Sequence, residues 1–350
     1  MLAEETDTPL RSGAATMSAA VVVGTGKPWE IREVPVPAPG PDEVLIKIAA
    51  SGLCHTDVHF TNVAPGDNFP MIFGHEPVGT VAAIGEAVTT RRIGDRVGTT
   101  TTQRTCGRCE WCLSAREISC PNPTNLFVHV PGGHAEYLVA VDRATTLIPD
   151  ELSFEQAAPL FCAGYTVMGG LLRAGLKPHD RVAVLGVGGL GHLAIQYAKA
   201  LGHETIAVTR SADKSALAKQ LGADKVVDAA AELLNDKVDV VLSTANSYAP
   251  AIAALTALRP DGRLVLIGIA DGDETFTIPS ELVFPAMMVN RWSVLGSQQN
   301  EREALTLALR FAAEGKIRAL TEAFPLEKAA EAFNRVARGE ARFRVVLVPH

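Results

Sequence analysis

One short stretch constrains the fold of this chain more than any other. The apolar run Val182–Leu185 leads directly into Gly186-Val187-Gly188-Gly189-Leu190-Gly191, and a helix-like segment follows. Strand, G-x-G-x-x-G turn, helix and second strand in this order are typical of a βαβ unit that binds dinucleotides. There the first glycine permits the tight turn, the second lets the backbone approach a pyrophosphate, and the third allows close helix–strand packing. We therefore predict that residues 186–191 hold a dinucleotide at a helix N-terminus.

The segments around this unit predict two domains of different class. After Cys162, strands alternate with alanine-rich helical stretches, which implies a doubly wound parallel sheet with helices on both faces. From Ala19 to about Val141, short β-rich runs separated by Gly and Pro predict a mostly antiparallel domain. A chain of 350 residues is long enough for two cores. We expect an α/β protein whose first domain spans 1–163, whose second spans 164–296, and whose last segment, 297–350, returns to the first domain.

The end of the second strand of the βαβ unit bears on which dinucleotide is bound. An Asp or Glu commonly stands there and accepts hydrogen bonds from the ribose hydroxyls of NAD. This chain has Thr209 instead, followed by Arg210, Ser211 and Lys214, which offer hydroxyl groups and positive charge. These groups suit the additional phosphate of NADP. The alternative is that Arg210 and Lys214 form only a solvated helix start.

Four cysteines lie within fifteen residues in the segment 104–122. Cys106, Cys109, Cys112 and Cys120 follow the spacing C-x2-C-x2-C-x7-C, which lets four thiolates converge on one tetrahedral zinc ion. Four protein ligands leave no open coordination position, so such a site is structural. Two disulfides are the alternative, but cytosolic disulfides are uncommon and no secretion signal accompanies the chain. We predict a structural zinc lobe.

The two remaining cysteines, Cys54 and Cys162, are distant in sequence. Cys54 opens the cluster His55-Thr56-Asp57-Val58-His59, and a second polar cluster is Gly74-His75-Glu76. Two thiolates and one imidazole would form a three-ligand zinc site with a fourth position open for water or substrate. Taken singly, each cysteine is more often a buried apolar filler, and a lone histidine is more often a hydrogen-bonded polar group than a ligand.

Composition excludes several function classes. The formal charge is −7 and no dense Lys/Arg block occurs, so we expect neither nucleic acid nor an anionic membrane surface as a partner. The apolar run from Val182 to Ala200 contains His192, Gln196 and Lys199, which argues against a membrane span. Residues 1–16 are acidic, lack the features of a signal peptide and are expected to be a disordered extension. We expect a cytoplasmic protein acting on small molecules.

Several stretches together resemble one family, the zinc-containing medium-chain alcohol dehydrogenases, including their yeast-type and cinnamyl-alcohol-type branches. The matching stretches, in family order from about Ala19 to the C-terminus, are CHTDVH, GHEPVGTVAAIG, GDRVG, CGRCEWC with the distant Cys120, LFCAGYT and VLGVGGLGHLAIQYAKALG. The resemblance implies a GroES-like catalytic domain beside a Rossmann domain. It further implies that Cys54, His75 and Cys162 bind a catalytic zinc and that the four-cysteine lobe binds a structural one.

The same resemblance implies roles for the polar neighbours of these ligands. Thr56 would hydrogen-bond the substrate hydroxyl, and His59 would pass its proton towards solvent. Asp57 would orient His75, and Glu76 would sit behind the zinc. A helix cap and a surface charge, respectively, are the alternatives for the two carboxylates.

Cofactor contacts also follow from the resemblance. Thr166 matches a position near the nicotinamide, and Ile267-Gly268-Ile269 matches a backbone segment that holds the carboxamide. His55 and Arg344 match pyrophosphate contacts, with Arg342 as a competitor for the latter role.

Two departures from the family pattern concern specificity. Thr209 replaces the Asp of NAD-dependent members, which favours NADP. Thr99–Thr102 contains no aromatic residue where yeast-type members narrow the pocket, so a wider substrate site is expected.

The predicted activity is hydride transfer between a primary or secondary alcohol and NADP(H) or NAD(H). The alternatives are a polyol or amino-alcohol dehydrogenase, a metal-free quinone or enoyl reductase, and a noncatalytic protein that binds zinc and nucleotide. The resemblance implies a homo-oligomer, dimer or tetramer, assembled through a sheet edge near Arg291–Gly296.

Overall fold

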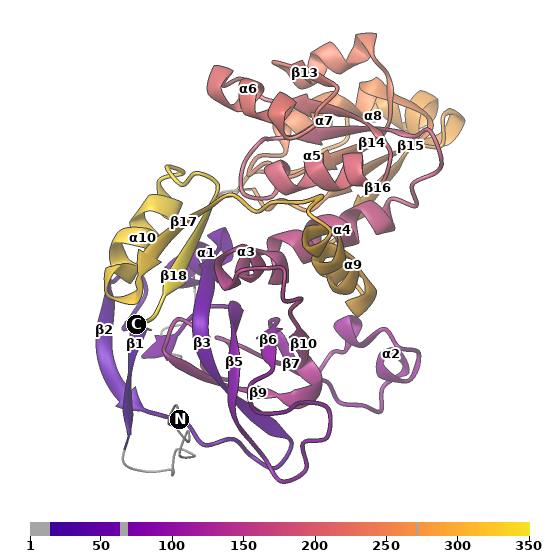
Figure 1. Cartoon of the computed structure of the whole chain (residues 1–350). Coiled ribbons are helices and arrows are strands. Elements are labelled where there is room, and N and C mark those ends of the chain that lie inside the picture. Colours follow the sequence, from indigo (N-terminus) through magenta and orange to yellow (C-terminus); the bar gives the residue numbers. More distant parts are fainter. Residues whose placement is uncertain (1–14, 64–68, 271) are drawn as a thin grey trace. The chain divides into compact units, whose positions relative to one another are not determined.

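The structure is a computed structural model that describes residues 15–63, 69–270 and 272–350. It divides into two compact units, one reaching Phe161 and resuming at Leu320–His350, the other spanning Cys162–Ala319 (Figure 1). Within the described residues, no helix is both long and apolar enough to cross a membrane.

The first unit is built mainly of antiparallel strands. Its larger sheet has the order β10-β6-β5-β3-β18-β17, with β9 also paired to β3, and only the β17–β18 pair is parallel. A smaller sheet has the order β2-β1-β4, and β7 pairs with β8. The strands are β1 (Thr16–Val22), β2 (Trp29–Pro35), β3 (Glu43–Leu53), β4 (Met71–Ile72), β5 (Glu76–Ile84), β6 (Arg96–Thr99), β7 (Thr102–Arg104), β8 (Thr124–Asn125), β9 (Tyr137–Val141), β10 (Thr145–Leu147), β17 (Thr321–Pro325) and β18 (Arg344–Val348).

Short helices complete this unit. They are α1 (His55–Val63), α2 (Glu110–Leu113), η2 (Glu117–Ser119), η3 (Asp142–Ala144), α3 (Phe154–Ala157), η4 (Ala158–Phe161), η8 (Leu326–Lys328) and α10 (Ala329–Ala337). The alternate residues Val44, Ile46 and Ile48 of β3 belong to one buried cluster, and Leu45 on the opposite face of the strand is buried as well.

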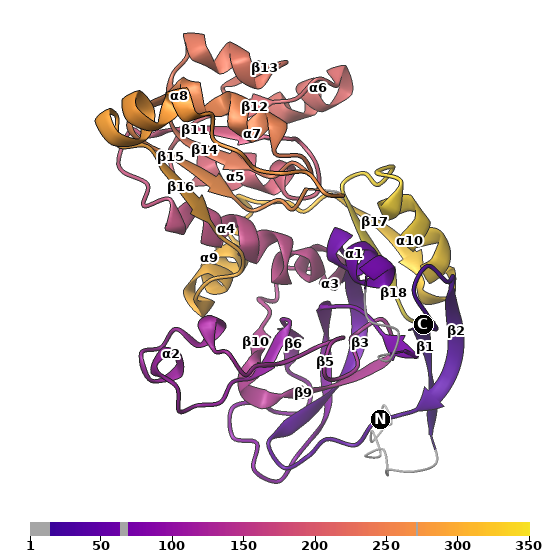
Figure 2. The ribbon, with the colours of Figure 1, turned by 180° about the vertical axis from the view of Figure 1, so that it is seen from behind.

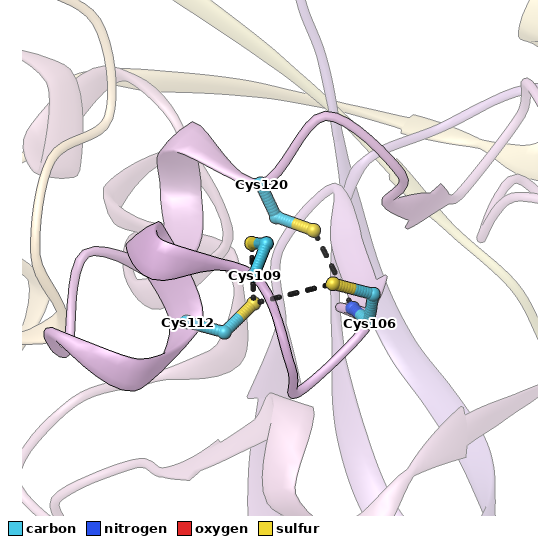
Figure 3. A group of neighbouring side chains, drawn as sticks. All are labelled: Cys106, Cys109, Cys112 and Cys120. Carbon is cyan, nitrogen blue, oxygen red and sulfur yellow. Dashed lines mark hydrogen bonds between the residues drawn. The ribbon is translucent and has the colours of Figure 1, made fainter.

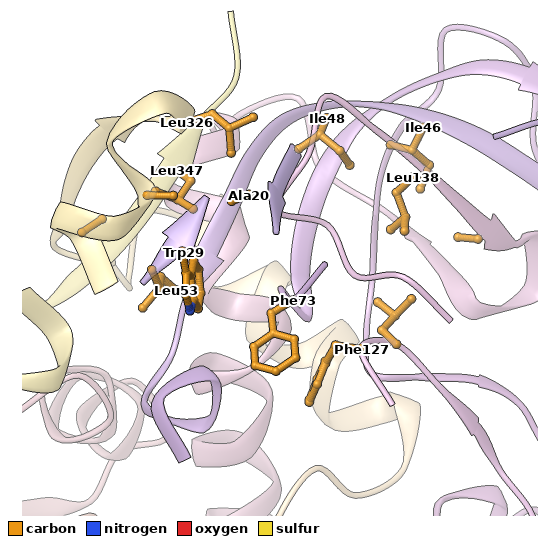
Figure 4. Close-up of a cluster of buried hydrophobic side chains, with 14 of the residues drawn as sticks. Ala20, Trp29, Ile46, Ile48, Leu53, Phe73, Phe127, Leu138, Leu326 and Leu347 are labelled. Carbon is orange, nitrogen blue, oxygen red and sulfur yellow. The ribbon is translucent and has the colours of Figure 1, made fainter. Parts of the chain in front are cut away.

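That core draws on both ends of the chain. Trp29 packs against Phe333 of α10 with ring centroids 4.8 Å apart. It also meets Phe73 edge to face (Figure 4). Leu326 and Leu347 belong to the same buried cluster. The segment from Leu320 onward is therefore an integral layer of the first unit.

The second unit contains a fully parallel six-stranded sheet in the order β13-β12-β11-β14-β15-β16. Numbered along the chain, the strand order is 3-2-1-4-5-6, the doubly wound arrangement. The point at which successive strands begin to be added on the opposite side lies between β11 and β14. The strands are β11 (Arg181–Leu185), β12 (Glu204–Val208), β13 (Lys225–Val227), β14 (Val238–Ser243), β15 (Leu258–Leu266) and β16 (Ser293–Gly296). The predicted α/β class, with a parallel sheet and a separate antiparallel domain, is confirmed.

Helices flank this parallel sheet on both sides (Figure 2). One group, α4, α5 and α9, packs together, and α7 packs with η5 and η6. The helices are α4 (Ala163–Arg173), α5 (Gly191–Ala200), α6 (Ala212–Gln220), η5 (Ala230–Asn235), α7 (Ala249–Ala254), η6 (Leu255–Ala257), α8 (Ser280–Leu282), the π-helix η7 (Val283–Val289) and α9 (Arg302–Ala313).

The predicted return to the first domain at residue 297 is wrong, because residues 297–319 belong to the second unit. Helix α9 packs on α4, the Tyr197 hydroxyl donates to the Ala308 carbonyl at 3.1 Å, and the Asn300 amide donates to the Gly169 carbonyl at 2.8 Å. The return begins at Leu320 instead. The predicted boundary at 163 lies two residues beyond the observed one at Phe161.

The predicted N-terminal extension, 1–16, falls mostly on residues 1–14, which lie outside the described residues. Its last residue is already structured, because β1 begins at Thr16 and pairs there with Pro35.

Candidate active site and cofactor turn

Three predicted zinc ligands, Cys54, His75 and Cys162, come together with Glu76 in one cluster. One ligand atom from each lies within 4.8 Å of all the others. Cys54 ends the turn between β3 and α1, His75 directly precedes β5, and Cys162 directly follows η4. His75 and Glu76 are buried, whereas both cysteines are half-buried.

The position of Cys162 is fixed by the packing of the preceding residue, Phe161, which is the last residue of the first unit. A Cβ added to Gly98 of β6 would lie 2.4 Å from the Phe161 ring, so only glycine admits that ring here. A Cβ on Gly52 of β3 would lie 1.9 Å from Glu76 Oε2. These glycines let the strands approach the cluster closely enough to assemble it.

Asp57 links two of the ligands. Its Oδ2 accepts a hydrogen bond from the Cys54 amide at 2.8 Å, and its Oδ1 lies 3.6 Å from His75 Nδ1. Burial alone would raise the pKa of Asp57, but the facing His75 and His134 imidazoles hold that pKa well below its usual range. Asp57 therefore combines the helix-cap interpretation with the predicted contact to His75.

Glu76 is fully buried, so the interpretation of it as a surface charge is wrong. Its Oε1 pairs with the Arg344 guanidinium, while Oε2 has no hydrogen-bond partner. Burial raises the pKa of Glu76 to about 7, against the opposing effect of Arg344. Arg344, predicted at the pyrophosphate, is thus buried beside the metal cluster, whereas its competitor Arg342 is exposed.

The predicted proton-relay residues lie on α1. Thr56 Oγ1 is 3.6 Å from Cys54 Sγ, and the His55 and His59 rings stack edge to face with centroids 4.8 Å apart. All three residues are half-buried. Their hydroxyl and imidazole groups are therefore partly accessible to solvent, as a proton relay requires.

His134 is a further residue near this site, and no motif in the sequence predicted it. It is fully buried, and its Nε2 lies 3.9 Å from Asp57 Oδ2. It comes from the loop 131–134 before β9, far from the recognised motifs. The adjacent pair Gly132-Gly133 was the sole signal, because consecutive glycines indicate a close backbone approach.

The four cysteines of the lobe also converge (Figure 3). Cys112 Sγ lies 3.4 Å from Cys109 Sγ and 3.9 Å from Cys106 Sγ, and all are free thiols. Thiolates bound to one tetrahedral zinc lie about 3.8 Å apart, so these separations fit a metal and not disulfides. Backbone N–H groups of Arg108 and Cys109 lower the pKa of Cys106 to about 6, which favours its thiolate.

The glycine turn lies between β11 and α5, as predicted. Gly186 has a φ of +88°, and a Cβ on Gly191 would lie 1.8 Å from the Gly186 carbonyl oxygen. A Cβ on Gly188 would meet nothing within 4 Å, so its backbone is open to an approaching ligand. The Thr244 hydroxyl, which the sequence analysis did not single out, bonds the Leu185 and Gly186 carbonyls at 2.9 Å each and fixes the turn.

The remaining cofactor candidates lie after neighbouring strands or on α4. Ile267 and Gly268 follow β15 and donate to the Ser243 carbonyl at the end of β14, and Ile269 is largely exposed. Since β11, β14 and β15 are parallel, these residues and the glycine turn all lie at the carboxyl ends of the strands, on the same edge of the sheet. Thr166 is buried in the first turn of α4.

Thr209 follows β12 as predicted, and it is buried. Its Oγ1 accepts a 3.5 Å hydrogen bond from the Ser211 amide, and the Ser211 hydroxyl caps α6 by accepting from the Lys214 amide. Arg210 and Lys214 are exposed. The start of α6 is therefore solvated, and its cationic residues Arg210 and Lys214 lie close in sequence to the end of β12.

Comparison with known proteins decides the family. Residues 40–150 match the alcohol dehydrogenase GroES-like domain, and residues 189–314 match the zinc-binding dehydrogenase family. An alcohol dehydrogenase of Geobacillus stearothermophilus is 42% identical over 95% of this chain and 99% of its own length. The chain belongs to the zinc-containing medium-chain alcohol dehydrogenase family. It is an oxidoreductase that uses zinc and a nicotinamide cofactor and acts on a small-molecule substrate.

Solved structures of this alcohol dehydrogenase family share the fold. A structure described as an NAD-dependent alcohol dehydrogenase has a TM-score of 0.86 and 33% identity, covering 95% of this chain and 99% of its own. A putative zinc-binding dehydrogenase from Sinorhizobium meliloti, bound to NADP, has a TM-score of 0.84 and 27% identity, covering 96% and 100%. Both nicotinamide cofactors therefore occur among its structural relatives.

Proposed function

We propose that this enzyme moves hydride between a primary or secondary alcohol and NADP(H), with NAD(H) as the poorer cofactor. One observation carries the proposal: Cys54, His75 and Cys162 converge within 4.8 Å beside a buried ion pair. Two thiolates and an imidazole are a donor set that zinc prefers, and three protein ligands leave the fourth position for substrate oxygen. The fourth member of the cluster, Glu76, is engaged by Arg344.

When bound, zinc supplies Lewis-acid polarisation of the substrate oxygen and the nicotinamide ring supplies the hydride acceptor or donor. The protein's own part is to orient and to move one proton. Thr56 would accept a hydrogen bond from the substrate hydroxyl at Oγ1 and would release its own hydroxyl proton as it takes up the substrate proton. His59, one helical turn further along α1, would pass the released proton to solvent. Asp57 holds His75 in orientation through its carboxylate.

The cofactor is assigned to the sheet edge that carries the glycine turn. Gly188 leaves room for the pyrophosphate. The Ile267–Ile269 backbone and Thr166 would hold the nicotinamide end. His55 and Arg344 remain assigned to the pyrophosphate, as the family resemblance implies. Arg210, Ser211 and Lys214, beside a strand end that bears no carboxylate, favour the phosphate of NADP.

The second metal is assigned to the four-cysteine lobe, so the enzyme holds two zinc ions per chain. The lobe zinc is structural, because its four thiolates complete the tetrahedral shell. Both clusters need reduced thiolates, which favours the cytoplasm as the compartment.

The assembly is proposed to be a homo-oligomer formed through the second unit. Strand β16 is the edge strand of the parallel sheet, and the adjoining π-helix exposes 67% of Phe284 and 65% of Met288. Exposed apolar groups beside an edge strand are typical of an interface.

The deciding experiment is aldehyde reduction followed by NADPH and NADH oxidation, with and without a zinc chelator. Benzylic and branched aldehydes are compared with acetaldehyde, because the all-threonine stretch Thr99–Thr102 favours larger substrates. We expect chelator-sensitive turnover with higher kcat/KM for NADPH.

Matched variants sharpen this test. Cys54→Ala should remove turnover and one zinc while leaving NADPH binding intact, since the glycine turn lies in the other unit. Ser114→Ala, an exposed change in the lobe, should behave as the unaltered enzyme. Normal turnover in Cys54→Ala would overturn the proposal.

A further inference from the structure

His134 is held against the segment that carries the zinc ligand His75. Its amide donates to the Phe73 carbonyl at 2.9 Å, and the amides of Gly132 and Gly133 donate to the Ile72 and Gly74 carbonyls at 2.7 and 2.8 Å. Three successive hydrogen bonds of this kind fix the loop relative to His75.

Glycine at three positions makes this approach possible. A Cβ on Gly74, whose φ is +101°, would lie 2.6 Å from His134 Nδ1. A Cβ on Gly132 would lie 2.4 Å from the Phe73 carbonyl oxygen, and one on Gly133 would lie 2.3 Å from the Pro77 side chain. Any other residue would force the two segments apart, so the close contact is built into the sequence.

A continuous line of buried polar side chains runs from β3 to the metal cluster. Ser51 Oγ lies 2.9 Å from His134 Nδ1, His134 Nε2 lies 3.9 Å from Asp57 Oδ2, and Asp57 Oδ1 lies 3.6 Å from His75 Nδ1. Ser51, His134, Asp57 and His75 are all at most 2% exposed.

The order of donors along this line is set by chemistry. When the Ser51 hydroxyl donates to Nδ1 of a neutral His134, the ring proton must reside on Nε2, the atom that faces Asp57. His134 Nε2 and His75 Nδ1 are buried nitrogens without a hydrogen-bond partner, and they face the two oxygens of the Asp57 carboxylate at 3.9 and 3.6 Å. At these separations the attraction to the carboxylate is electrostatic, and it favours the observed alignment of the two rings because the site is buried.

We infer that His134 is a positioning residue of the catalytic metal site: oriented by Ser51, its imidazole supports Asp57, which in turn orients the ligand His75. The inference rests on the proposed zinc site, and it adds a third layer behind the metal. Packing alone does not account for His134. An apolar side chain could occupy the same space beside Trp29, whose ring centroid lies 5.4 Å from that of His134, but it would leave the Ser51 hydroxyl without this partner.

The test compares His134→Phe with His134→Gln in the zinc-loaded enzyme. Phenylalanine keeps the ring and removes both nitrogens, whereas glutamine retains a donor that can reach Asp57. Zinc release to a chromogenic chelator is followed in time, and the lobe zinc of the same molecule serves as the internal reference. We expect release of the catalytic zinc to be about tenfold faster in His134→Phe, as for other groups that support zinc ligands. In His134→Gln the release rate should return most of the way to that of the unaltered enzyme.

A second readout reports ligand geometry without turnover. After cobalt replaces the catalytic zinc, its visible absorption should shift in His134→Phe and Ser51→Ala, and return towards the original in His134→Gln. His203→Phe is the matched control, because His203 is also buried but bonds the Asp180 carbonyl in the second unit. That variant should leave both release phases and the spectrum unchanged.

The outcomes separate cleanly. If the unaltered enzyme binds no zinc at Cys54, His75 and Cys162, the proposed function itself fails. If it binds zinc but His134→Phe changes neither the release phase nor the cobalt spectrum, or accelerates both phases equally, only the role of His134 is overturned. Should His134→Phe not fold, Ser51→Ala decides: an unshifted spectrum refutes the inference, and a shifted one supports it.

Discussion

Thr209 is the residue on which cofactor choice depends. It directly follows β12, and the two cationic residues after it, Arg210 and Lys214, are exposed. Thr209→Asp places a carboxylate that accepts from ribose hydroxyls and repels a phosphate. Because a hydrogen bond to a charged group is worth about 1.5–3 kcal/mol, the ratio of kcat/KM for NADPH over NADH should fall about tenfold or more.

The control for this prediction is Lys219→Ala, which removes an exposed cation from the far end of the same helix, α6. Steady-state kinetics with both cofactors should find its ratio unchanged. An unchanged ratio in Thr209→Asp as well would mean that the adenosine end of the cofactor lies elsewhere.

The residues that sequence reasoning could find were those with a pattern. The four lobe cysteines were predicted from spacing, and Cys54, His75 and Cys162 from a family resemblance, because all three ligands lie far apart in the chain. His134 could not be found, since its role depends on tertiary contacts to Ser51 and Asp57. Arg344 was predicted to contact the pyrophosphate, but its ion pair with Glu76 could not be predicted. That pair depends on the sheet order, in which β18 and β5 lie on either side of β3.

At the level of the βαβ element, the three glycines differ in what they do, and alanine substitutions should separate them. Gly191→Ala puts a Cβ 1.8 Å from the Gly186 carbonyl oxygen, so the protein itself must deform. Gly188→Ala meets no protein atom within 4 Å and should obstruct only the cofactor. We expect Gly191→Ala to lower the free energy of unfolding by about 1–3 kcal/mol.

Gly188→Ala should instead keep the unfolding free energy within about 0.5 kcal/mol and weaken NADPH binding about tenfold or more. Chemical denaturation and titration of NADPH fluorescence measure the two effects. Equal loss of stability in both variants would contradict the assignment of Gly188 to the pyrophosphate.

The cysteine lobe is an element without a core of its own. Neither α2 nor η2 contains a buried residue, and Cys120, itself a candidate ligand, is the one buried residue of 104–122, so the stability of this segment should depend on metal binding. Cys109→Ser should remove one zinc per chain and open residues 104–122 to proteolysis. Elemental analysis and mapping of a limited digest test this, with Ser114→Ala as the control. A resistant lobe that still holds its zinc would refute a structural metal here.

At the scale of the whole molecule, strand and helix periodicity predicted both fold classes but not where the chain changes units. The amphipathic stretch now seen as α9 has an apolar face that suits either core, and sequence does not say which one it covers. In the structure, α9 belongs to the second unit because it packs on α4 and its Ala308 carbonyl accepts a hydrogen bond from Tyr197. Such choices depend on three-dimensional fit, which periodicity does not encode.

The proposed assembly depends on exposed apolar side chains of the second unit. Phe284 and Met288 project from η7 with 67% and 65% of their surface exposed, next to Val289 at 55% and the edge strand β16. Carboxylates introduced at these two positions would be buried without partners in the proposed interface. The double variant Phe284→Asp/Met288→Glu should therefore be a monomer at micromolar concentration where the unaltered chain is the proposed oligomer. Leu234→Asp, at an exposed leucine of the same unit, should leave the assembly intact. Sedimentation velocity distinguishes these outcomes, and an oligomer that survives the double variant would place the interface on another face.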